Sequence, residues 1–110
     1  MNMFDTFLKD LNEQGGSVRA YDGCARAARA RIASEPQNAA ALLLIAYAAQ
    51  RFVEAYDDQP LSLKAAGEEL EVFSDMVNTL DRAHKGGSPQ EKLDALNVVA
   101  AKLAAQFAKS

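Results

Sequence analysis

One continuous apolar segment constrains the fold of this chain most strongly. It spans the eleven residues from Ala39 to Ala49, which read AAALLLIAYAA and carry no charge. The other helical stretches of the chain are plainly two-sided. A bilayer-spanning helix needs roughly 20 apolar residues, so the segment is too short to cross a membrane. We therefore expect a helix that is covered on nearly every face, either by its own chain or in part by another protein.

The length and the cysteine content predict one domain without disulfide bonds. A chain of 110 residues forms a single domain over 1–110 and buries about two thirds of its unfolded surface. Cys24 is the only cysteine, which excludes an internal disulfide. Asp5, Lys9 and Asp10 interrupt the first eleven residues, so these do not resemble a secretory signal. A cytoplasmic protein is the resulting expectation.

The charges are distributed unevenly along the chain. The total of 12 basic and 15 acidic residues gives a net charge of −3, which argues against nucleic acid as a partner. Residues 17–51 carry five arginines and two acids, a net charge of +3, whereas residues 52–83 carry eight acids and two basic residues, a net charge of −6. The middle of the chain is therefore polarised.

Glycine and proline residues divide the chain into helical segments. The breaks lie at Gly15-Gly16, Pro36, Pro60 and 86–89, and apolar residues recur at helical spacing between them. Five helices are predicted: a short one up to Leu11 that lies across the others as a lid, and longer ones over about 17–34, 37–58, 62–83 and 89–109. Ser17 is a suitable N-cap, and residues 88–91 (SPQE) form a capping box.

The four longer helices each carry an apolar seam, and no strand pattern competes with them. We therefore predict an all-α fold, a four-helix bundle with a short additional N-terminal helix. The seams are Val18, Tyr21, Ala25, Ala28 and Ile32; Leu42, Ile45, Ala49, Phe52 and Tyr56; Leu63, Ala66, Leu70, Phe73, Val77 and Leu80; and Leu93, Leu96, Ala100, Leu103 and Phe107.

Two candidate catalytic groupings are incomplete. Cys24 lies close in sequence to Arg19 and Arg26, which could activate a thiol, but no base accompanies it. Asp81 and His84 have the i, i+3 spacing of a di-iron ligand pair, yet His84 is the only histidine and such sites need a second pair. We expect a structural cysteine and a solvated histidine at a helix end, and no enzymatic activity.

The charged clusters also lack the features of cofactor or nucleic-acid sites. Five acids, Asp57, Asp58, Glu68, Glu69 and Glu71, surround the turn at Pro60 but lack the ligand ladder and glycine of an EF-hand loop. A solvated or partner-facing acidic surface is expected there, with neither metal nor cofactor. The row of Arg19, Arg26 and Arg29 has no interleaved aromatic residues and includes Asp22.

A family resemblance adds a functional expectation. A helix that opens near Tyr21 closes with Arg31-Ile32-Ala33-Ser34-Glu35-Pro36, an apolar helix ends with Gln50-Arg51-Phe52-Val53, and Leu63, Gly67, Val72 and Phe73 begin the next. This order resembles the small all-helical immunity proteins of bacterial type VI secretion systems, including those that neutralise NAD-degrading toxins. The stretch 36–40 (PQNAA) is similar to part of another such immunity protein. The resemblance covers about residues 21–73, and the helix over 89–109 departs from it.

The resemblance implies a protein that occupies the active cleft of a toxin without catalysis. An acidic bundle suits a basic cleft, because opposite charges speed encounter. We expect the partner-binding residues to be Glu54, Asp57, Asp58, Glu68, Glu71 and Asp75. The alternative is a secretion chaperone or adaptor that binds an effector through an apolar groove around Leu43, Leu44 and Tyr47. The apolar run can serve as a core or as a homodimer interface, and both demand the same residues.

Overall fold

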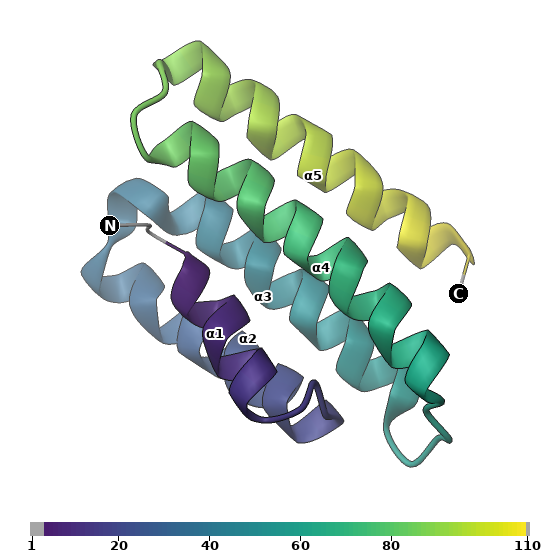
Figure 1. Cartoon of the computed structure of the whole chain (residues 1–110). Coiled ribbons are helices and arrows are strands. Elements are labelled where there is room, and N and C mark those ends of the chain that lie inside the picture. Colours follow the sequence, from purple (N-terminus) through teal and green to yellow (C-terminus); the bar gives the residue numbers. More distant parts are fainter. Residues whose placement is uncertain (1–3, 110) are drawn as a thin grey trace.

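The computed structural model describes residues 4–109, and it describes side chains for residues 4–106. Within this range the chain is all-helical and contains no strand. The elements are α1 (Asp5–Glu13), α2 (Val18–Ser34), the 3-10 turn η1 (Pro36–Asn38), α3 (Ala39–Tyr56), α4 (Leu63–His84) and α5 (Pro89–Lys109). Figure 1 shows α3, α4 and α5 running side by side, with α1 and α2 on one flank.

Serine side chains cap the N-termini of three helices, and the sequence predicts the caps at Ser17 and Ser88. The Ser17 hydroxyl accepts a hydrogen bond from the Ala20 N–H at 3.1 Å, and Ser62 caps α4 in the same way at 3.0 Å. At α5 the predicted capping box is confirmed: Glu91 N–H donates to the Ser88 hydroxyl at 3.1 Å, and Ser88 N–H donates to the Glu91 carboxylate at 3.2 Å. These bonds satisfy backbone donors that have no partner within the helix.

The central contact of the fold joins α2 and α3. It is the most extensive contact between two helices, and alanines line it on both sides: Ala25, Ala28, Ala41 and Ala49 are fully buried. Small side chains let two backbones approach closely, as expected from the α2 seam. At one end of this contact the Tyr21 ring stacks on Phe52 with centroids 3.8 Å apart, and Phe73 of α4 meets Tyr21 edge-on at 5.4 Å.

The remaining helices pack around this pair. α1 packs against α2 and α4, α4 packs against α3, and α5 packs against both α3 and α4. α1 is a covering helix that also contributes to the core, because Phe4, Phe7 and Leu11 on its inner face are buried members of the hydrophobic cluster. Figure 1 shows α5 beyond α4, on the side away from α1.

Two predicted seams differ from the buried faces. α5 buries Ala95, Val99 and Leu103, while Leu93 and Ala100 of the predicted seam are exposed, and the side chain of Phe107 lies outside the described residues. In α4 the seam is buried from Phe73 onward, but Leu63, the first residue of α4, is 93% exposed.

The apolar run of α3 is covered on most but not all of its circumference. Leu42, Ile45 and Ala49 are buried, whereas Leu43 is exposed and Tyr47 is 53% exposed. Leu43 and Tyr47 are four residues apart and therefore share one face of the helix. The expectation of cover on nearly every side is thus wrong for this face. None of the described helices has the length and apolar character needed to span a membrane.

Candidate functional site

An open groove between α4 and α5 brings three of the predicted partner-binding residues together. Glu68, Glu71 and Asp75 lie at i, i+3 and i+7 on α4 and therefore line one edge of the helix. The groove has a volume of about 520 Å³, and Val72 and Lys102 complete its lining. Val72 is exposed within the acidic row. The site therefore combines carboxylates with one accessible apolar side chain.

The groove carries an excess of negative charge. Asp75 forms an ion pair with Lys102 of α5, with 2.6 Å between the Asp75 Oδ2 and the Lys102 Nζ. Glu68 and Glu71 have no ion-pair partner among residues 4–106. Because the paired side chains are about half exposed, this contact is worth at most about 1 kcal/mol and yields readily to another cation. The surface can therefore accept Lys or Arg side chains from a partner.

The other three predicted residues lie outside this groove. Asp57 and Asp58 are exposed in the turn between α3 and α4, where Asp58 adopts a left-handed conformation with φ of 57°. Glu54 is exposed on α3, about three helical turns after Leu43 and about two after Tyr47, on the same face of the helix. The predicted acidic set is therefore divided between a groove, a turn and the outer face of α3.

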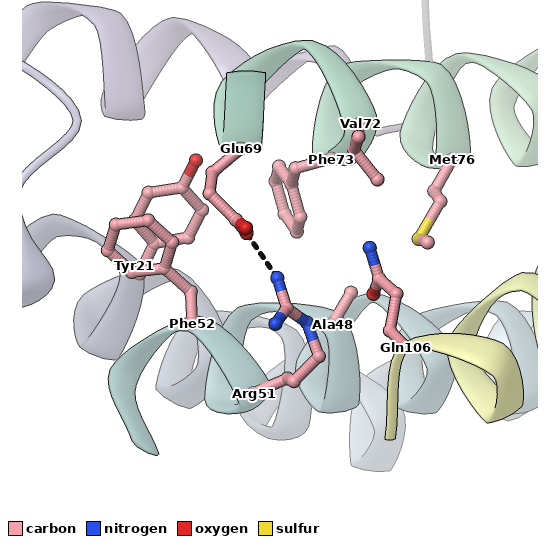
Figure 2. A pocket seen from close by; sticks show the side chains of 9 residues that line it. All are labelled: Tyr21, Ala48, Arg51, Phe52, Glu69, Val72, Phe73, Met76 and Gln106. Carbon is pink, nitrogen blue, oxygen red and sulfur yellow. Dashed lines mark hydrogen bonds and ion pairs between the residues drawn. The ribbon is translucent and has the colours of Figure 1, made fainter. Parts of the chain in front are cut away.

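A polar cluster inside the molecule was not predicted from the sequence. Arg51 of α3 and Glu69 of α4 form an ion pair, and the Tyr56 hydroxyl donates to the Glu69 carboxylate at 3.4 Å. Figure 2 shows this pair at a small pocket that Tyr21, Met76 and Gln106 help to line. The side chains of Arg51 and Glu69 are only 13% and 22% exposed, so the pair joins α3 to α4 rather than facing a partner.

The position of Glu69 has a signal in the sequence. Glu69 precedes Phe73, Met76 and Leu80 by four, seven and eleven residues, and all three are buried. This spacing places the carboxylate on the inner face of α4, whereas Glu68 and Glu71 point away from it. Proximity to Pro60 does not distinguish Glu69 from the other four acids, whereas the helical register of α4 does.

The side chain of Cys24 is buried and its thiol is not activated. Burial raises the pKa of Cys24 to about 12, and the negative charge of Asp10 adds to this effect. A nucleophilic cysteine needs the opposite shift, because the thiolate is the reactive form. The structure therefore gives Cys24 a packing role in α2.

Asp81 and His84 are engaged with the N-terminal helix. The Asp81 carboxylate is buried and accepts a hydrogen bond from the Phe4 N–H at 2.8 Å. The His84 ring lies edge-on to Phe4, and its Nδ1 is 2.9 Å from the Leu80 carbonyl oxygen. His84 is half-buried rather than fully solvated. Among the described residues no three His, Cys, Asp or Glu side chains come together as a metal site would require.

Three of the four arginines of α2 lie on its exposed side. Arg26 pairs with Asp22 across one helical turn at 3.1 Å, as the sequence predicts, and Arg19 and Arg29 are exposed.

No family model, curated protein or solved structure matches this chain.

Proposed function

We propose that this protein is a non-enzymatic protein-binding module, an immunity protein that neutralises a bacterial toxin by occupying its active cleft. The proposal includes a cytoplasmic site of action and reads the helices as a four-helix bundle with a short additional N-terminal helix. The observation that carries it is the open acidic groove between α4 and α5, lined by Glu68, Glu71 and Asp75.

The groove suits a partner surface that is basic and partly apolar. Clefts that bind nucleotides or other phosphates are rich in Lys and Arg, and carboxylates on the inhibitor attract such a surface over a distance of about one Debye length. Once contact forms, Val72 can be buried against an apolar side chain of the partner. Charge then governs the association rate, and the buried contacts govern dissociation.

The experiment is a growth rescue. A secreted toxin that the proposal expects to be encoded beside this gene is expressed alone and together with the protein, and the purified toxin is assayed with and without it. The proposal expects restored growth, loss of toxin activity at equimolar protein and a complex that co-purifies. A neighbouring toxin that keeps its full activity in the presence of the protein would contradict it, as would a gene neighbourhood without a toxin.

A second candidate function has one observation in its favour. Leu43 and Tyr47 are exposed on the outer face of α3, where a secretion chaperone or adaptor would bind its effector. That function predicts a stable dimer or an effector complex sealed by this face. Light scattering of the purified protein distinguishes the two candidates. A dimer that Tyr47→Glu dissociates favours the adaptor, and a monomer that inhibits the toxin favours the immunity protein.

A further inference from the structure

Helix α1 occupies a groove between α2 and α4 in the manner of a bound peptide. It packs against these two helices, which make no extensive contact with each other in the described part of the chain. Three anchor residues, Phe4, Phe7 and Leu11, are buried at i, i+3 and i+7. The other side chains of α1 are exposed apart from Leu8. This is the pattern of an amphipathic helix bound in a groove.

The groove recognises the start of α1 through specific groups. The Phe4 N–H donates to the buried Asp81 carboxylate at 2.8 Å. Phe4 is the N-cap residue of α1, and its side chain makes no capping hydrogen bond to the helix. A negative charge at this place also favours the positive end of the helix dipole. The Arg31 guanidinium lies 5.7 Å from the Phe4 ring centroid and 5.1 Å from that of Phe7, so aromatic anchors are favoured at both positions.

The connection to α2 allows α1 to leave while the rest of the chain stays in place. Gly15 and Gly16 both adopt positive φ values, 73° and 65°, and nothing lies within 4 Å of either Cβ position. Neither glycine therefore has a neighbour on the side where a Cβ would stand. A helix of nine residues has little stability of its own in water, so α1 is ordered by the groove.

We propose that the α2–α4 groove is a binding site for an amphipathic helix of another protein, and that α1 covers it in cis. The ligand helix carries aromatic residues at i and i+3 and a large aliphatic residue at i+7, and it directs its N-terminus toward Asp81. Such a helix displaces α1, which stays tethered at the two glycines. This site is separate from the acidic groove and does not depend on the proposed function.

The test uses the full-length chain and a fluorescent peptide with the sequence of residues 4–14, acetylated so that the Phe4 nitrogen remains an amide. In the wild type, α1 competes at an effective concentration in the millimolar range. The variant Phe4→Ala/Phe7→Ala loses two anchors and leaves the groove available. It should bind the peptide at least about tenfold more tightly than the wild type does, because the competing anchors are gone. A control peptide with Phe7→Ala should bind neither protein.

A helical variant that fails to bind the peptide, or that binds both peptides equally, would overturn the proposal. Hydrogen exchange of the wild type decides the matter if the variant does not fold. The amides of residues 9–13 should exchange at least about tenfold faster than those in the middle of α2 and α4, because α1 opens on its own. Exchange of α1 only together with the whole molecule would overturn the proposal.

Discussion

Arg51 and Glu69 form an ion pair that joins the last turns of α3 to the second turn of α4, with both side chains largely withdrawn from solvent. The Tyr56 hydroxyl adds a third contact to the Glu69 carboxylate. The pair lies beside the stacked rings of Tyr21 and Phe52, as Figure 2 shows. The ion pair and the aromatic packing beside it therefore both stabilise the end of α3 that precedes the turn to α4.

Removing one partner of this pair should destabilise the fold. Glu69→Leu leaves the Arg51 guanidinium without its counter-charge in a mostly buried position, which costs about 2 kcal/mol. Replacing both residues, with Arg51→Met and Glu69→Leu, removes the charges together and should be less costly than the sum of the single changes. Denaturant unfolding of the four proteins measures this coupling. Strictly additive effects would show that the pair is energetically unimportant.

The hydroxyl of Tyr21 is buried and has no hydrogen-bond partner among the described residues. Burial raises its pKa, so the hydroxyl stays neutral. Tyr21→Phe keeps the stacked ring and removes an unsatisfied group, so the free energy of unfolding should stay the same or rise by up to about 1 kcal/mol. Tyr56→Phe is the matched control, because it loses the bond to Glu69 and should be slightly less stable. A larger loss for Tyr21→Phe than for Tyr56→Phe would reveal a partner for the Tyr21 hydroxyl.

The stability should depend on acid through Glu35. Hydrogen bonds from Arg31 at 2.6 and 2.9 Å lower the pKa of the Glu35 carboxyl in the folded state. An unfolded Glu has a pKa of about 4.3, so the stabilisation is complete above this value and is lost as the pH falls toward the folded-state pKa. Glu35→Gln should therefore be less stable than the wild type near neutral pH, and the difference should shrink below about pH 4. A difference that stays constant over this range would argue against the assignment.

The Cys24 thiol should be protected from alkylation. With its pKa raised to about 12 by burial, the native protein holds little thiolate at mildly alkaline pH. Labelling at about pH 8 should be at least about a hundredfold slower in the native protein than in concentrated guanidinium chloride, where the pKa returns to about 8.5. Native labelling at the rate of a free thiol would show that Cys24 is accessible and activated.

The helices were predictable from the sequence because their signals are local. The serine caps, the glycine pair and the prolines define the ends of the helices through bonds within a few residues. The position of α4 and the whole extent of α5 agree with the predicted ranges.

The direction in which each helix faces was less predictable. In α5, Leu93-Leu96-Ala100 and Ala95-Val99-Leu103 both have helical spacing, and packing against α3 and α4 selects the second set. An alanine-rich helix offers several similar faces, so its orientation depends on its neighbours and not on its own pattern. The acidic groove also depends on how α4 and α5 are placed relative to each other. The sequence therefore predicts the row of acids along α4, but not the edge of the groove that α5 forms.

The most direct test of the account measures how tightly Glu68→Lys/Glu71→Lys binds the toxin that the proposed function requires, as a dissociation constant. Both side chains are exposed, so the melting temperature should stay almost unchanged, while like charges at the interface should weaken binding by about tenfold or more and slow association. Glu13→Lys/Asp94→Lys changes the net charge equally outside the groove and should bind nearly as the wild type does. An unchanged dissociation constant for Glu68→Lys/Glu71→Lys would contradict the assignment of the acidic groove as the binding surface.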